Sequence, residues 1–133
     1  MSEENATVLT RHRILVADDN QDAATSLGAL LEVMGHDVRV VHDGMAAVEV
    51  SASFRPDTVL LDIGMPQMNG YDACRDIRTQ SSNQDVLIVA LTGWTGEDMK
   101  QRARQAGFDM YLIKPVEMPA LEKLLAEHPP KRH

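Results

Sequence analysis

Hydrophobic residues along the chain gather in short apolar runs, and longer amphipathic stretches separate these runs. A continuous apolar run bounded by turn residues predicts a strand buried on both faces, whereas apolar residues that recur every three or four positions predict a helix. The strands are expected at Arg13–Ala17, Asp37–Val41 (where polar and apolar residues alternate), Thr58–Asp62, Asp85–Leu91 and Phe108–Ile113. The helices are expected at Ala23–Met34, Met45–Phe54, Gly70–Thr79, Glu97–Ala106 and Met118–Glu127.

Regular alternation of strands and helices indicates right-handed βαβ crossovers and a parallel sheet that is covered on both faces. The expected fold class is therefore α/β, with a doubly wound five-stranded parallel sheet. A length of 133 residues fits one domain. Residues 1–12 have no periodicity and are expected to form a flexible N-terminal arm, residues 13–127 the domain, and residues 128–133 a C-terminal tail or linker stub.

Unusual polar residues stand where four of the expected strands end. Asp18 and Asp19 follow the first strand, Asp62 ends the third, Thr92 follows the fourth and Lys114 follows the fifth. The carboxyl ends of parallel strands meet at one edge of the sheet, where open α/β folds bind ligands. Three carboxylates brought together repel one another unless a cation joins them, and Mg²⁺ prefers such oxygen ligands.

The side chains of Lys114 and Thr92, at the same edge, suit an anionic ligand. The Lys114 ammonium suits a phosphate oxygen, and the Thr92 hydroxyl is a hydrogen-bond donor. Together with a metal ion they describe a pocket for a phosphoryl group carried on a carboxylate, in which Asp62 acts as the nucleophile. Several of these residues also have a purely structural interpretation: Asp62 as a turn residue, the pair Asp18 and Asp19 as acidic residues at a helix N-terminus, and Thr92 as a helix cap before Glu97.

Composition narrows the function classes further. The formal net charge is −7, which disfavours direct binding to nucleic acid or to an anionic membrane. One cysteine, Cys74, fits a reducing compartment and is expected to pack in a helix. Neither a signal peptide nor an apolar segment of membrane-spanning length is present in the sequence, so a cytoplasmic location without membrane insertion is expected. The five histidines are scattered and lack the spacing of metal ligands.

Four motifs occur in an order and spacing that resembles the receiver domain of bacterial two-component response regulators. They are Ile14–Asn20, Leu60–Pro66 with Gly70, Ala90–Gly93 and Tyr111–Pro115. The resemblance covers roughly residues 12 to 127, and the ordered set is far more specific than any single motif. The run that ends at Trp94 is also similar to receivers of hybrid sensor kinases and, more broadly, the chain is similar to single-domain regulators.

The resemblance implies a flavodoxin-like (βα)5 fold and a role in phosphorelay signalling. Asp62 would be the phosphoacceptor, in a Mg²⁺-dependent reaction with a histidine kinase or a histidine phosphotransfer protein; Mn²⁺ is an alternative ion. The implied metal ligands are Asp19, Asp62 and the backbone carbonyl of Gly64, with Asp18 acting through water. The implied phosphoryl-binding and switch residues are Thr92, Gly93, Tyr111 and Lys114, with a cis bond to Pro115, and Trp94 is a candidate modulator of phosphate hydrolysis.

The same resemblance implies self-phosphorylation and self-dephosphorylation rather than turnover of a separate substrate. A downstream protein target is expected on the face formed by the helix Glu97–Ala106, the strand Phe108–Ile113 and the helix Met118–Glu127. One alternative is a phosphatase of the haloacid dehalogenase type, but its nucleophile stands on the first strand, whereas Asp62 ends the third. The other alternative is a receiver-like scaffold that is not phosphorylated, although every active-site position matches.

Overall fold

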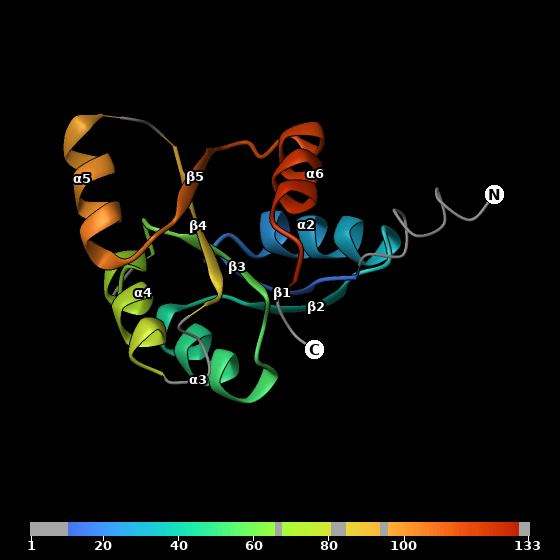
Figure 1. Ribbon diagram of the computed structural model, residues 1–133, viewed down its shortest axis with the longest axis horizontal. Helices are drawn as coiled ribbons and strands as arrows, with labels where there is room; N and C mark the ends of the chain where they lie inside the picture. The colour runs from blue at the N-terminus through green and yellow to red at the C-terminus, as the bar shows by residue number, and fades with distance from the viewer. Residues whose placement is uncertain (1–10, 66–67, 81–84, 94–95, 131–133) are drawn as a thin grey trace.

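The computed structural model describes residues 11–65, 68–80, 85–93 and 96–130. Within these residues five parallel strands form one sheet in the order β2-β1-β3-β4-β5 (Figure 1). The strands are β1 (Arg13–Ala17), β2 (Asp37–Val41), β3 (Thr58–Asp62), β4 (Leu87–Thr92) and β5 (Met110–Ile113). The helices are α2 (Gln21–Val33), α3 (Gly44–Phe54), α4 (Gly70–Thr79), α5 (Glu97–Ala106) and α6 (Met118–Glu127). The expected doubly wound α/β fold is confirmed.

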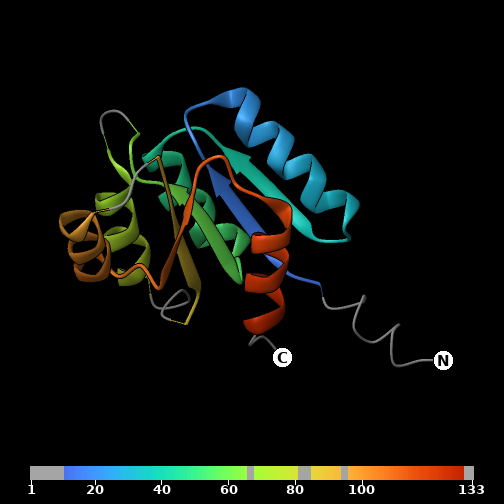
Figure 2. The ribbon, with the colours of Figure 1, turned by 90° about the horizontal axis from the view of Figure 1, so that it is seen from above.

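Helices cover both faces of the sheet. Figure 2 shows α2 and α6 on one face and α3, α4 and α5 on the other. Alternate residues of the central strands supply the two cores: Ile14 and Leu60 face α2 and α6, and Leu15 and Leu61 face the other three helices. All five residues of β3 are buried, which explains why this strand reads as a continuous apolar run up to Asp62.

Side-chain caps start three helices directly beyond the carboxyl edge of the sheet. Asn20, Asp43 and Asn69 each accept a hydrogen bond from a backbone N–H in the first turn of α2, α3 and α4, respectively. At the far ends of α2 and α5, Gly35 and Gly107 adopt φ values of 100° and 110°, which stops these helices. The bounds of α4, α5 and α6 match the expected ranges, whereas α2 begins at Gln21 and not at Ala23, and α3 begins at Gly44 and not at Met45.

Two strands begin later than their apolar runs indicate. β4 begins at Leu87 and not at Asp85, and β5 begins at Met110 and not at Phe108. Phe108 is buried, but its N–H donates to the carbonyl of Ala103 and so still belongs to the turn that closes α5. The apolar pattern therefore indicates which residues are buried, whereas the strand itself begins where the hydrogen bonds to the neighbouring strand start.

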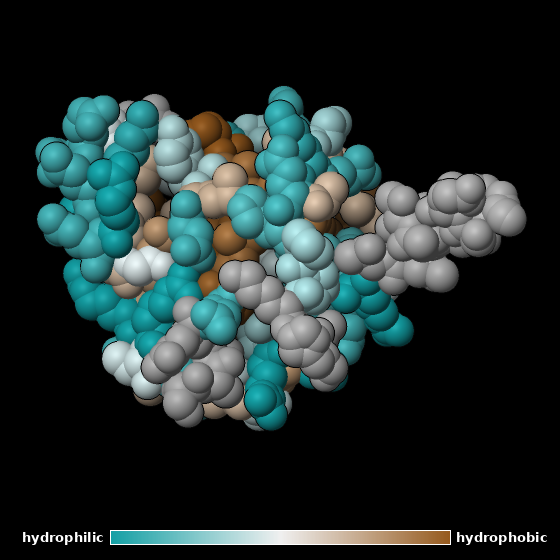
Figure 3. Space-filling model, viewed as in Figure 1, coloured by the Kyte–Doolittle hydropathy of each residue, from teal (hydrophilic) through white to brown (hydrophobic). Residues whose placement is uncertain are grey.

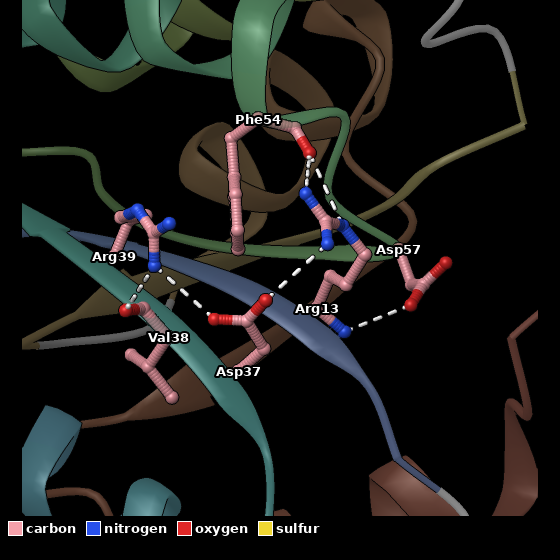
Figure 4. A network of polar contacts seen from close by, with 6 residues as sticks. All are labelled: Arg13, Asp37, Val38, Arg39, Phe54 and Asp57. Carbon is pink, nitrogen blue, oxygen red and sulfur yellow. Dashed lines mark hydrogen bonds and ion pairs between the residues drawn. The ribbon is translucent and has the colours of Figure 1, made fainter.

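A polar network ties the opposite edge of the sheet together (Figure 4). The Arg13 guanidinium contacts the Asp37 carboxylate at 3.2 Å, and the Arg13 N–H donates to Asp57 at 2.8 Å. The Phe54 ring lies between two guanidinium groups, 4.3 Å from that of Arg13 and 4.6 Å from that of Arg39. The network joins the starts of β1 and β2 to the end of α3, so it supports the fold at the end remote from the acidic strand ends.

His12 corrects the expected extent of the N-terminal arm. Its side chain is 2% exposed, and its Nε2–H donates to the carbonyl of His128 at 3.2 Å. Its backbone N–H donates to Nδ1 of His36 at 3.1 Å. His12 therefore belongs to the packed domain, as does the His128 carbonyl that it contacts. A single buried polar residue before a strand leaves no hydrophobic periodicity, which is why the sequence pattern did not reveal it.

Candidate functional site

The expected acidic residues converge at the carboxyl edge of the sheet. Asp18 follows β1 and is 3% exposed, and Asp62 ends β3 and is 6% exposed, whereas Asp19 is exposed. One carboxylate oxygen from each of the three lies within 4.8 Å of the other two. Negative charges this close repel one another, so the arrangement is stable only with positive charge nearby.

Lys114 supplies positive charge to this cluster. Its Nζ lies 3.0 Å from Oδ2 of Asp18 and 3.1 Å from Oδ2 of Asp62. Burial, the largest single influence, lowers the pKa of the Lys114 ammonium, but hydrogen bonds and charge from Asp18 and Asp62 outweigh it, so the net pKa is raised. Lys114 therefore stays charged and bridges the two buried carboxylates.

Backbone packing fixes the position of Asp62. The N–H of Gly64 donates to Asp62 Oδ1 at 2.9 Å. Gly70, the first residue of α4, packs so tightly here that a Cβ would lie 2.5 Å from the Asp62 carbonyl oxygen and 2.6 Å from Cα of Ile63. Only glycine allows α4 to approach β3 this closely. The phosphoacceptor candidate is thus carried on a rigid support, with its second carboxylate oxygen directed to Lys114.

The end of β2 holds Asp18 through its backbone. The Asp18 N–H donates to the carbonyl of Val41 at 3.2 Å, and Nδ1 of His42 lies 3.2 Å from the Asp18 carbonyl oxygen. Asp18 Oδ1 also accepts the N–H of Asn20 at 3.0 Å. His42 was missed by sequence reasoning, which searched the histidines only for metal-ligand spacing. Its place directly after a strand, at the edge that carries the acidic residues, was the available signal.

The expected switch residues lie around Lys114. Thr92, at the end of β4, is 1% exposed, and its carbonyl accepts the Lys114 N–H at 2.7 Å. The expected cis bond between Lys114 and Pro115 is confirmed. Tyr111 is 37% exposed, and the Lys100 ammonium lies 5.7 Å from the centre of its ring, so the ring stands at the surface beside α5.

Two of the remaining expected site residues are glycines at the surface. Gly64 and Gly93 are exposed beside Asp62 and Thr92, respectively, while Trp94 lies outside the residues that the structure describes. Cys74 is buried, and burial raises the pKa of its thiol to about 12, in keeping with the expected packing role.

The donor set at the acidic edge fits a metal ion. Carboxylate oxygens are the ligands of hard divalent cations. Across the described ranges, Asp18, Asp19 and Asp62 form the one group of three or more acidic, histidine or cysteine side chains close enough to hold an ion. The edge therefore combines a candidate metal site with a lysine that can contact an anionic group.

Comparison with known proteins decides the family. The response regulator receiver domain family matches residues 14–126. The chain is a response regulator receiver domain. Among similar proteins, response regulator MprA of Mycobacterium ulcerans (strain Agy99) is 41% identical over 114 residues, and MprA of Mycobacterium tuberculosis (strain ATCC 25618 / H37Rv) is 40% identical. Each alignment covers 86% of this chain and 47% of the MprA protein, so the chain spans about half the length of these relatives.

Solved structures place the receiver domain in the same family. The Vibrio cholerae chemotaxis protein CheY4 matches with a TM-score of 0.83 and 28% identity, covering 87% of this chain and 97% of CheY4. The receiver domain of sensor histidine kinase PA1611 from Pseudomonas aeruginosa PAO1 matches with a TM-score of 0.81 and 34% identity, covering 88% and 96%. The PA1611 receiver was crystallised with a magnesium ion coordinated in its active site cleft.

Family membership settles the broad function. Receiver domains of response regulators act in two-component phosphorelay signalling, take phosphoryl groups from histidine kinases and are generally not classical enzymes. The phosphatase alternative is not favoured. In the part of the chain that the structure describes, no helix combines the length and apolar character that a membrane span requires.

Proposed function

We propose that this receiver domain accepts a phosphoryl group on Asp62 from a phosphohistidine of a histidine kinase or a histidine phosphotransfer protein. The observation that carries the proposal is the buried Asp62 carboxylate beside a second buried carboxylate, Asp18, with the Lys114 ammonium in contact with both. A cytoplasmic location fits a chain with a single cysteine. Neither direct nucleic-acid binding nor membrane insertion forms part of the proposal, in keeping with the net charge of −7.

The acidic edge would hold Mg²⁺, or alternatively Mn²⁺. Asp19, Asp62 and the backbone carbonyl of Gly64 are the proposed direct ligands, and Asp18 would act through water. The clustering of three carboxylates supports this assignment. When bound, the ion supplies positive charge that offsets the charge of the phosphoryl oxygens during transfer.

The residues of the chain have separate parts in the transfer. A carboxylate oxygen of Asp62 forms a bond to phosphorus as the bond from phosphorus to the histidine nitrogen breaks, and the imidazole leaves with the electron pair. Lys114, 3.1 Å from Asp62 Oδ2, is close enough to hydrogen-bond an oxygen of the new phosphoryl group. Hydrolysis of the acyl phosphate regenerates Asp62, so the only reactions proposed are those that the domain undergoes itself.

The phosphoryl group would act as a switch. It carries about 1.5 to 2 negative charges and three strong acceptors, in place of the single charge of the Asp62 carboxylate. Thr92 would turn its hydroxyl toward this group, Gly93 would let the loop follow, and Tyr111 would move inward from its present surface position. A loop arrangement that donates to the phosphoryl group gains population only after phosphorylation. Trp94 is proposed as a modulator of phosphate lifetime.

A downstream protein would bind the face formed by α5, β5 and α6. Figure 3 shows apolar surface over β5 between the polar outer sides of α5 and α6. Tyr111 and Ile113 are 37% and 43% exposed there, and a cavity of about 260 Å³ lies between α5 and β5. Apolar side chains inside a polar rim are typical of protein interaction sites.

Intact-mass spectrometry after incubation with acetyl phosphate tests the phosphoacceptor. Wild type and Asp62→Asn are compared with and without Mg²⁺. We expect one phosphoryl adduct on wild type in the presence of Mg²⁺, and none on Asp62→Asn. A matched control is Asp57→Asn, which removes a carboxylate at the opposite edge of the sheet.

Two results would contradict the proposal. One is an adduct of equal yield on Asp62→Asn, which would place the phosphoryl group elsewhere. The other is a folded wild-type domain that takes no phosphoryl group from acetyl phosphate or from phosphorylated histidine kinases, which would favour the scaffold alternative.

A further inference from the structure

The end of β2 holds both backbone groups of Asp18. The N–H of Asp18 donates to the Val41 carbonyl at 3.2 Å, as a continuation of the pairing between β1 and β2. The carbonyl of Asp18 lies 3.2 Å from Nδ1 of His42, the next residue after Val41. Asp18 is 3% exposed, so its carbonyl has little access to water and gains from a protein donor.

This contact defines the hydrogen position on the His42 ring. A carbonyl oxygen only accepts hydrogen bonds, so Nδ1 of His42 must carry the hydrogen and donate it. The neutral ring then carries its lone pair on Nε2. The contact therefore has a direction, and a ring of the same shape without a donor cannot replace it.

The carbonyl in question belongs to the peptide unit that joins Asp18 to Asp19. A peptide unit is planar, so fixing its carbonyl also fixes the direction of the Asp19 N–H and restricts where the Asp19 side chain can go. The same loop is held on its other side, where Asp18 Oδ1 accepts the Asn20 N–H at 3.0 Å. His42 is thus the side chain that orients the backbone between two members of the acidic cluster.

We infer that His42 is a positioning residue of the metal site. By donating Nδ1–H to the Asp18 carbonyl it holds the carboxylates of Asp18 and Asp19 within reach of Asp62. The inference rests on the proposed function, because it assigns His42 a part in holding the ion that the acidic cluster would bind. A residue that supports ligands in this way typically changes metal affinity by 10- to 100-fold.

Two substitutions separate the donor from the ring. His42→Phe keeps a ring of similar shape and removes the donor. His42→Asn removes the ring and places its amide Nδ2–H where Nδ1–H stands. Mg²⁺ affinity is measured by calorimetric titration, and thermal unfolding without metal shows that each variant is folded. We expect His42→Phe to bind Mg²⁺ about tenfold more weakly, at the low end of such effects, and His42→Asn to bind close to the wild-type value.

A spectroscopic measurement on the metal-free protein tests the contact itself. Nitrogen NMR of the histidine rings at neutral pH should show His42 with its hydrogen on Nδ1. A hydrogen on Nε2 alone would overturn the inference, since Nδ1 could not then donate.

Failure of the inference about His42 can be told apart from failure of the proposed function. Equal Mg²⁺ affinity of wild type and His42→Phe, or a loss in His42→Asn as large as in His42→Phe, would overturn the part assigned to His42 and leave the proposed function intact. A folded wild-type domain that binds no Mg²⁺ would overturn both.

Discussion

At the scale of the single residue, Lys114 competes with a metal ion for the same carboxylates. Its ammonium lies within hydrogen-bond distance of both Asp18 and Asp62. Lys114→Met removes one positive charge from the acidic edge, so we expect Mg²⁺ to bind up to about tenfold more tightly, the scale of one unit charge in a partly exposed site. The variant should also lose the phosphorylation-dependent change of conformation, because the phosphoryl group loses its cationic partner.

Calorimetric titration with Mg²⁺ measures the first effect. Lys123→Met is the matched control, since it makes the same change of net charge on the exposed side of α6. Weaker Mg²⁺ binding in Lys114→Met than in Lys123→Met would show that Lys114 supports the metal site rather than competing with the ion.

His36 makes the free energy of unfolding of the receiver domain depend on pH in the acidic range. Burial, followed by the nearby His12 and Arg11, lowers the pKa of the His36 ring below its usual value of 6.5. The unfolded chain therefore takes up this proton at a higher pH than the folded chain. The free energy of unfolding falls as the pH decreases from about 6.5 toward the lower folded pKa. Protonation also removes the lone pair with which Nδ1 accepts the His12 N–H.

His36→Asn isolates this effect. Its side-chain oxygen can accept the same N–H but does not titrate in this range. Urea unfolding at pH 7.5 and at pH 5 should show a smaller loss of stability in the variant than in wild type. Equal losses in the two proteins would assign the acid sensitivity to other groups.

The sequence alone located those candidate site residues whose position follows from the pattern of their own segment. Asp62, Thr92 and Lys114 stand at strand ends, and the ends are visible in the apolar pattern. His42 and His12 were missed because their roles depend on partners that lie 24 and 116 positions away in the sequence. No local pattern reveals such a partner.

At the scale of the element, the junction between β3 and α4 determines how firmly Asp62 is held. A Cβ on Gly70 would lie 2.5 Å from the Asp62 carbonyl oxygen and 2.6 Å from Cα of Ile63. Both neighbours are backbone atoms and cannot rotate away. We expect Gly70→Ala to lower the free energy of unfolding by about 1–3 kcal/mol, the range for overpacked sites, and to slow phosphorylation of Asp62.

Gly64→Ala is the matched control. Among the residues that the structure describes, a Cβ there would meet only Asp62 Oδ1, at the ordinary contact distance of 3.6 Å. Chemical denaturation should therefore leave its stability close to that of wild type. If Gly70→Ala is no less stable than Gly64→Ala, the approach of α4 to β3 is not as constrained as the distances indicate.

Three helices and three strands have the bounds expected from the sequence, and the bounds of the other elements differ for physical reasons. Asn69 and Gly107 mark helix ends by local capping, and both signals are present in the sequence itself. The starts of β4 and β5 depend on the hydrogen-bond ladder with a neighbouring strand. Buried residues such as Val86 and Phe108 extend the apolar runs beyond that ladder.

At the scale of the whole molecule, alternation of strands and helices predicts a parallel sheet but not the order of its strands. The order β2-β1-β3-β4-β5 depends on which strands pair across long stretches of sequence. With β1 and β3 adjacent, Asp18, which follows β1, and Asp62, the last residue of β3, meet at one edge. The periodicity alone does not contain this order, and the resemblance to receiver domains implied only the flavodoxin-like class of fold.

The carboxylates that meet at this edge repel one another and so destabilise the metal-free fold. Asp19 is the exposed member of the cluster, while Lys114 contacts the other two carboxylates. Removing the Asp19 charge relieves repulsion, so we expect metal-free Asp19→Asn to be more stable than wild type by roughly 1 kcal/mol or less, the scale of charge interactions at exposed sites. Saturating Mg²⁺ should reverse the order. An ion at a hundred times its dissociation constant adds about 2.7 kcal/mol to wild type, whereas the variant lacks one proposed ligand.

Denaturant unfolding with EDTA and with Mg²⁺ measures both effects on the same two proteins. Asp76→Asn, which removes a carboxylate from the exposed side of α4, controls for the change of net charge and should respond to Mg²⁺ as wild type does. If Asp19→Asn is less stable than wild type in EDTA, the three carboxylates do not repel one another at a cost to the fold. If instead Mg²⁺ stabilises Asp19→Asn as much as wild type, Asp19 is not a ligand, and the acidic edge holds its ion through Asp18 and Asp62.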